Sequence, residues 1–318
     1  MPSVELPDVG LLEHRPLPLK TSWWVAPLDA RVVHDCPLLM LSGVGLESWS
    51  LDIMHTWHLG PIQLLVSMSF NYCLDSGLWC PATHIDSEEK RKLGLLALKA
   101  ELYQWYREMR KDPDWLGKGS EETWTGNKNS SKLVRASLEP CTQVWNLTLS
   151  MIGGSNAPGL HAKAAESHGL LLFVRYILDV HGPEFSTLRD PCMARKGKVL
   201  LEAATAALDL DVVFSSESRS FTRQESQRAL GVYLRFLSFY DKAGGPWIPK
   251  CHLMIHLLQN TVFKGNPRLY STYRDESFNG LIAKIARSCH RRTWHNIVHF
   301  KCQALHRRRH DALLKRLG

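Results

Sequence analysis

The chain has 318 residues, of which 44% are hydrophobic and 22% are charged, and its net charge is +8 at neutral pH. This length and composition allow a full hydrophobic core and exclude a wholly disordered chain. No apolar run is long enough to cross a membrane, and the N-terminus lacks the basic and apolar regions of a signal peptide. We therefore expect a soluble intracellular protein without a membrane partner.

The predicted elements are short strand-like runs within residues 1–50, interrupted by prolines and glycines, followed by helices. Asp86 and Thr222 each precede a glutamate by three residues, which is the pattern of a capping box. The stretch 112–131 is rich in Gly, Ser, Asn, Lys and Glu and predicts a linker. The fold is therefore expected to be mainly α with a small β contribution near the N-terminus. The helices are expected at about residues 50–60, 62–73, 86–111, 132–151, 160–181, 192–213, 222–242, 250–261, 272–290 and 293–317.

The eight cysteines are scattered, and none of them forms a C-x-x-C pair. This spacing is typical of reduced thiols in the cytosol or nucleus. It is not the spacing of a disulfide framework or a zinc ribbon.

Asp52 and His55 are three residues apart, so on a helix they share one face. The carboxylate would then hold the imidazole by a hydrogen bond and select its tautomer. The alternative is an acid that favours a helix N-terminus, with a histidine nearby by chance. His58 lies on a similar face and adds little to either interpretation.

His252 and His256 are four residues apart, which is a spacing compatible with zinc. A zinc site would need two more ligands, for which Cys251, Cys289 and His290 are the available candidates. The alternative is a pair of histidines packed beside a stripe of leucines.

Asp275 and Glu276 begin a predicted helix in the most basic part of the chain. The helical phase puts Glu276 opposite the apolar stripe, on a face with Gly280 and Ala283. A phosphodiester could approach the backbone there while Glu276 binds Mg²⁺. The alternative is an acidic first turn that stabilises the helix dipole.

The residues from Lys264 onward include 13 Lys and Arg but only three acids, so they carry +10 while the remainder of the chain carries −2. Such a segment suits sequence-independent contact with phosphates, although a solvated basic helix or a nuclear-localisation patch has the same composition. The candidate DNA-binding residues are Arg274, Lys284, Arg287, Arg291, Arg292, Lys301, Arg307, Arg308, Arg309, Lys315 and Arg316.

Three segments, in order, resemble the C-terminal half of CACTA-type (En/Spm-like) DNA transposases. Residues 51–60 (LDIMHTWHLG) are similar to the D-x-x-H segment of that family. Residues 160–173 (LHAKAAESHGLLLF) are similar to a helix of its helical insertion. Residues 249–257 (PKCHLMIHL), followed by 273–280 (YRDESFNG), are similar to its closing segment.

The resemblance implies an RNase H-like catalytic core interrupted by a helical insertion, in which three acids bind two Mg²⁺ ions for attack on phosphodiester bonds. Carried over by position, Glu276 would be the third acid, and Asp52 and His55 the signature pair just after the second. Asp29 or Asp35 would then be that second acid. Only about 28 residues precede Asp29, so we expect the first strands and the first acid to be missing.

The expected domain organisation follows from this resemblance. Residues 1–111 would be a partial RNase H-like core and 112–131 a linker. Residues 132–248 would be the helical insertion, and 249–318 the closing segment with basic DNA-binding helices.

We therefore expect a truncated or degenerate transposase-derived protein that acts in the nucleus, binds DNA without sequence preference and does not cleave strands. Mg²⁺ is expected only if a catalytic site assembles, and otherwise no cofactor. One alternative is a helical nucleic-acid-binding module without catalytic ancestry. A further alternative is a structural zinc protein that uses His252 and His256. The sequence does not indicate the oligomeric state.

Overall fold

The computed structural model is mainly helical in the parts that it describes, which are residues 50–80, 85–111, 143–216, 219–290, 292–293, 296–304 and 307. For residues 110–111, 216, 274–278 and 280–281 only the backbone is described. Within these ranges the β structure is limited to one isolated bridge between Gly153 and Pro158, which confirms the mainly α prediction there. The predicted strand runs and the predicted linker lie outside the described residues. None of the described helices is long and apolar enough to span a membrane.

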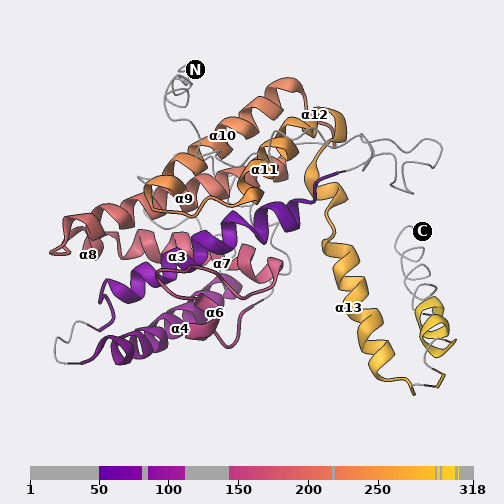
Figure 1. Cartoon of the computed structure of the whole chain (residues 1–318), viewed down its shortest axis with the longest axis horizontal. Coiled ribbons are helices and arrows are strands. Elements are labelled where there is room, and N and C mark those ends of the chain that lie inside the picture. Colours follow the sequence, from indigo (N-terminus) through magenta and orange to yellow (C-terminus); the bar gives the residue numbers. More distant parts are fainter. Residues whose placement is uncertain are drawn as a thin grey trace, which may run out of the picture. The chain divides into compact units, whose positions relative to one another are not determined.

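The chain divides into two compact units, Met1–Leu269 and Tyr270–Gly318, which we call the first and second units (Figure 1). The described helices of the first unit are η4 (Met54–His58), α3 (Pro61–Asp75), α4 (Ser87–Lys111), α6 (Leu149–Ile152), α7 (Ala164–Val180), α8 (Gly182–Ser186), α9 (Pro191–Ser216), α10 (Arg223–Lys242), α11 (Pro249–Gln259) and α12 (Thr261–Lys264).

Three of these helices begin at a start signal that the sequence predicts. The Asp86 carboxylate accepts hydrogen bonds from the backbone N–H groups of Glu88 and Glu89, at 2.7 and 2.9 Å, and so starts α4. Thr222 accepts from the backbone N–H of Glu225 at 3.2 Å, and the Glu225 carboxylate accepts from the backbone N–H of Thr222 in return. Pro61 occupies the first turn of α3, where its missing N–H has no cost.

The helix predicted over 132–151 is wrong for residues 143–148, which are not helical, and α6 begins only at Leu149. The backbone N–H of Val144 donates to the Tyr106 hydroxyl instead of entering a helix, and Val144 and Leu147 are buried. The Thr148 hydroxyl then caps α6. Contact with α4 therefore determines the conformation of residues 143–148, in place of the predicted helix.

The helices of the first unit form a continuous series of neighbours, in which α4 contacts α3, α3 contacts α7, α7 contacts α9, α9 contacts α10 and α10 contacts α11 (Figure 1). The short η4 contacts α3, α7 and α11, and so joins the last helix of the series to two of its earlier helices. One hydrophobic core runs through all of them, from Ile53 to Leu258. The expected partial core, insertion and start of the closing segment thus contribute to one common core.

The second unit contains α13 (Tyr273–Arg287), close to the helix predicted over 272–290. Residues 296–304 are also helical, within the helix predicted over 293–317. Val298 is buried in this segment, whereas Phe300 is 71% exposed.

Gly197 in α9 permits a close helix contact that can be tested. A Cβ at this position would lie 2.4 Å from the Tyr72 hydroxyl oxygen, so α3 and α9 can approach only because the side chain is absent. We expect Gly197→Ala to lower the free energy of unfolding by about 1–3 kcal/mol, measured by urea denaturation.

Gly231 in α10 is the matched control, because a Cβ there meets no atom within 4 Å. Gly231→Ala is expected to raise the free energy of unfolding by up to about 1 kcal/mol. Adding Tyr72→Phe to Gly197→Ala removes the clashing oxygen and should recover part of the loss. Equal stability of Gly197→Ala and the wild type would contradict this account of the contact.

Candidate functional site

Three titratable side chains from separate helices converge inside the first unit: His58 from η4, His168 from α7 and Asp211 from α9. Their ligand atoms all lie within 4.8 Å of one another. His168 Nε2 lies 2.8 Å from Asp211 Oδ2, and His58 Nε2 lies 3.9 Å from Asp211 Oδ1. The two imidazole rings pack with their centroids 4.5 Å apart. We call this group the His–His–Asp cluster.

The cluster is shielded from solvent, since the side chains of His58, His168 and Asp211 are only 7%, 14% and 5% exposed. A carboxylate at such a position is stable only when charged or hydrogen-bonding groups surround it. The two histidines supply that environment.

Trp57 supplies a further hydrogen bond to the cluster. Its indole Nε1–H donates to Asp211 Oδ1 at 3.3 Å. The ring itself is fully buried and meets Tyr233 and Phe236 of α10 edge-on, with centroids 5.6 and 4.9 Å away. The indole thus fixes the orientation of the carboxylate through rigid aromatic packing.

The geometry of η4 places two consecutive residues in this buried region. The backbone N–H of Leu59 donates to the carbonyl of Met54, five residues earlier, so the turn is a π-helix. Gly60 follows, and Lys250 of α11 donates from Nζ to the Leu59 carbonyl at 2.6 Å. A π-helical turn is wider than an α-helical turn, and both Trp57 and His58 of η4 are buried. Such π-helical turns are frequent at functional sites.

The electrostatics of the cluster favour an ionised carboxylate and a neutral His58. Burial alone raises the pKa of Asp211, but the charge of His168, the hydrogen bond with His168 and the nearby His58 outweigh it, so the pKa lies well below its usual range. Burial is the main cause that lowers the pKa of His58, and the charge of His168 adds to it, against the opposing effect of Asp211. A neutral imidazole beside a carboxylate is a donor pair for a metal cation or a proton.

Asp52 and His55 lie at the start of η4 as predicted. His55 Nδ1 lies 2.6 Å from Asp52 Oδ2, and the same oxygen accepts from the backbone N–H of His55 at 3.0 Å. The carboxylate therefore caps the turn and holds the imidazole at the same time, so the two interpretations of this pair are compatible. The His55 side chain is 52% exposed.

His252 and His256 face one another on α11, with their Nε2 atoms 2.9 Å apart. Burial lowers the pKa of His252, and the charge of His256 lowers it further. Within the described part of the chain, the His–His–Asp cluster is the group of three metal-ligating side chains that converges, and this histidine pair does not belong to it.

The acids that the resemblance assigns to the catalytic site fall largely outside the described residues. Asp29 and Asp35 lie there, and the backbone of Glu276 is described, in α13, without its side chain. The catalytic site formed by Glu276 with Asp29 or Asp35 therefore stays a prediction. Of the predicted DNA-binding side chains, the described ones are all exposed: Lys284, Arg287, Arg292, Lys301 and Arg307.

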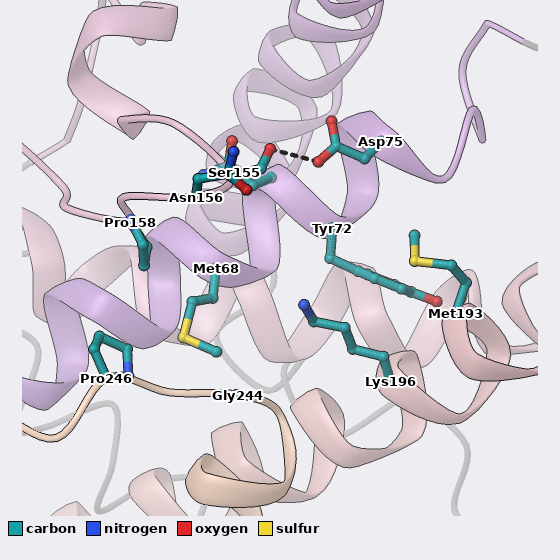
Figure 2. Close-up of a pocket in the computed structure, with 11 residues that line it drawn as sticks. Met68, Tyr72, Asp75, Ser155, Asn156, Pro158, Met193, Lys196, Gly244 and Pro246 are labelled. Carbon is teal, nitrogen blue, oxygen red and sulfur yellow. Dashed lines mark hydrogen bonds between the residues drawn. The ribbon is translucent and has the colours of Figure 1, made fainter.

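A groove between α3, α9 and the loop 153–159 is a concave feature of the first unit (Figure 2). Its polar groups already bond one another, since the Ser155 hydroxyl donates to the Asp75 carboxylate at 2.6 Å and Arg91 pairs with the same carboxylate. Figure 2 shows Tyr72, Met193 and Lys196 together along the groove. The His–His–Asp cluster is therefore the better candidate site.

The sequence interpretation missed His168 and Asp211 and dismissed His58, although a signal was present. Asp211 follows the buried Ala207 by four residues and precedes the buried Phe214 by three, which places an acid on an apolar helix face. A charged residue on such a face signals a buried partner.

Parts of the three segments of the predicted resemblance pack together in the first unit. The turn η4 lies within residues 51–60, and it contacts both α7, which includes most of residues 160–173, and α11, which includes residues 249–257. Residues 273–280 belong to α13 of the second unit. Comparison of the chain with family models, curated proteins and solved structures gives no match.

The lowered pKa of His58 predicts a pH dependence of stability. In the folded state this pKa lies below the unfolded value of about 6.5, so the unfolded chain takes up a proton first as the pH falls. The contribution to stability is therefore present above about pH 6.5 and is lost toward pH 5, by at most about 1.4 kcal/mol per pH unit for one proton.

We expect the free energy of unfolding, measured in urea with EDTA present, to fall between pH 7 and pH 5. His58→Asn should make this dependence shallower, whereas His161→Gln, at an exposed position, should leave it unchanged. An identical pH dependence in wild type and His58→Asn would show that His58 does not stay neutral in the folded protein.

Proposed function

We propose that the protein binds nucleic acid without sequence preference through the second unit, and that it derives from a CACTA-type transposase without retaining strand cleavage. The observation that carries the binding proposal is the set of exposed basic side chains in the second unit. Each belongs to the described residues: Lys284, Arg287, Arg292, Lys301 and Arg307.

No acid neutralises this surface from within its own segment, because the sequence contains no Asp or Glu between residues 277 and 310. The exposed His290 and His299 add positive charge when they are protonated. A run of exposed cations without counter-charges attracts a polyanion and releases its condensed counterions on binding. This mechanism requires no recognition of bases, so it supports sequence-independent contact.

The transposase origin rests on the resemblance of the motif segments. Its support is that Asp52 and His55 of the D-x-x-H segment are hydrogen-bonded, and that the turn carrying them packs against α7 and α11. An RNase H-like core with Glu276 and Asp29 or Asp35 as surviving acids belongs to the same proposal.

The binding proposal predicts a salt-dependent affinity for DNA. Wild-type protein should bind a labelled duplex of arbitrary sequence in fluorescence anisotropy, with an affinity that falls steeply as salt rises. The variant Arg287→Gln/Arg292→Gln/Lys301→Gln/Arg307→Gln should reduce the slope of log affinity against log salt by up to about 3–4, since each lost phosphate contact contributes about 0.9.

A matched control removes the same charges from the first unit. Arg189, Arg195, Lys198 and Arg223 are exposed there, so changing all four to Gln lowers the net charge by the same amount. This control should bind DNA with a nearly unchanged slope. Equal losses in both variants would mean that net charge, and not the second unit, governs binding.

The absence of strand cleavage has its own test. Purified protein incubated with supercoiled plasmid and Mg²⁺ or Mn²⁺ should leave the plasmid uncut, because the resemblance assigns only two of the three acids that a two-metal site requires. Nicking that Glu276→Gln abolishes would refute the inactive part of the proposal. If Glu276→Gln changes neither DNA binding nor the response to metal, a binding module without catalytic ancestry explains the data equally well.

A further inference from the structure

We propose that His58, His168 and Asp211 form a binding site for a single zinc ion. All three residues belong to the first unit, and the proposal does not depend on the nucleic-acid proposal. It joins η4, α7 and α9 in the centre of the first unit.

The donor atoms are already close to the positions that a shared ion requires. Ligand atoms of a tetrahedral zinc site lie roughly 3.3 Å apart, as the usual Zn–N and Zn–O distances of about 2.0–2.1 Å imply. His168 Nε2 and Asp211 Oδ2 are 2.8 Å apart, and His58 Nε2 is 3.9 Å from Asp211 Oδ1. All the ligand atoms lie within 4.8 Å of one another, so side-chain shifts of roughly 0.5 to 1.5 Å would admit the ion.

The chemistry of the donors selects the class of metal. Two imidazole nitrogens disfavour Mg²⁺ and Ca²⁺, which take oxygen ligands. Two histidines and one carboxylate also bind Fe²⁺, but that ion keeps several open positions for water or substrate. The three side chains are at most 14% exposed, so the site leaves little room beyond one water molecule, as a four-coordinate zinc requires.

The protonation of the cluster is compatible with this role. Zinc binds deprotonated imidazole nitrogens, so each histidine would offer one such nitrogen to the ion. In the metal-free protein, His168 Nε2 and Asp211 Oδ2 share a hydrogen bond. On binding, zinc takes the place of that proton, which His168 either moves to Nδ1 or releases to solvent.

The surroundings of the cluster match those of a metal site. Ligating carboxylates are usually held by a further hydrogen bond, and Trp57 provides one to Asp211 Oδ1. The indole is itself fixed by Tyr233 and Phe236. The ion would thus bind to a preformed set of donors, and it would hold η4 against two long helices.

The experiment uses the full chain carrying an affinity tag without histidine, purified without chelator. Metal analysis by mass spectrometry should find one zinc per chain. After removal of the metal, Co²⁺ should give the visible absorption of a four-coordinate site without the charge-transfer band of a thiolate ligand. Zinc should also raise the melting temperature of the metal-free protein.

Two single variants remove ligands with little change of volume. His168→Gln alters the most exposed ligand, and Asp211→Asn keeps the acceptor of the Trp57 hydrogen bond. Each should lower zinc affinity by more than about 100-fold, since loss of an outer-shell partner alone costs 10–100-fold. Circular dichroism shows whether each variant is folded, and a folded His168→Gln suffices if Asp211→Asn does not fold.

The double variant His252→Gln/His256→Gln is the matched control, because it removes the other histidine pair and leaves the cluster intact. It should retain one zinc per chain. Loss of zinc from this control together with its retention in His168→Gln would overturn the proposal. So would a wild type that binds neither Zn²⁺ nor Co²⁺, or one that contains stoichiometric iron or manganese in place of zinc.

Discussion

A carboxylate inside an apolar helix bundle constrains everything that packs around it. An unpaired charge at the position of Asp211 would cost roughly 3–5 kcal/mol, so the surrounding helices must present donors to it. They do so from two directions, with Trp57 and His58 on η4 and His168 on α7. α9 presents Asp211 to the interior of the bundle, and the π-helical turn η4 places Trp57 and His58 beside it. The aromatic residues of α10 in turn hold Trp57 in position.

The helices were predictable where local chemistry decides them. The capping residues Asp86 and Thr222 and the proline at position 61 define helix starts that the structure reproduces. The segment 143–148 was not predictable, because its conformation depends on a hydrogen bond to Tyr106, which is 38 residues away from Val144. Tertiary contact overrides propensity there, and no local pattern reveals it.

The candidate site was predictable only in part. The pairing of Asp52 with His55 follows from their spacing of three residues and is present. The His–His–Asp cluster needs the relative placement of three helices, and its members are 43 to 153 residues apart in the sequence. Spacing rules apply within one helix, so they could single out His252 and His256 but could not bring His58 together with Asp211. The visible hint was an acid on an apolar face, which shows that a partner exists without identifying it.

The long sequence separation within the cluster has a consequence for the order in which the protein folds. The hydrogen bond from Trp57 to Asp211 spans 154 residues, and the rings that enclose Trp57 come later still, from α10. A chain emerging from the ribosome therefore cannot complete the native environment of Trp57 until Phe236 has been synthesised. Contacts of such high sequence separation slow folding and prolong the exposure of apolar surface. The first unit is thus expected to require chaperone protection during synthesis, until α10 has packed against η4.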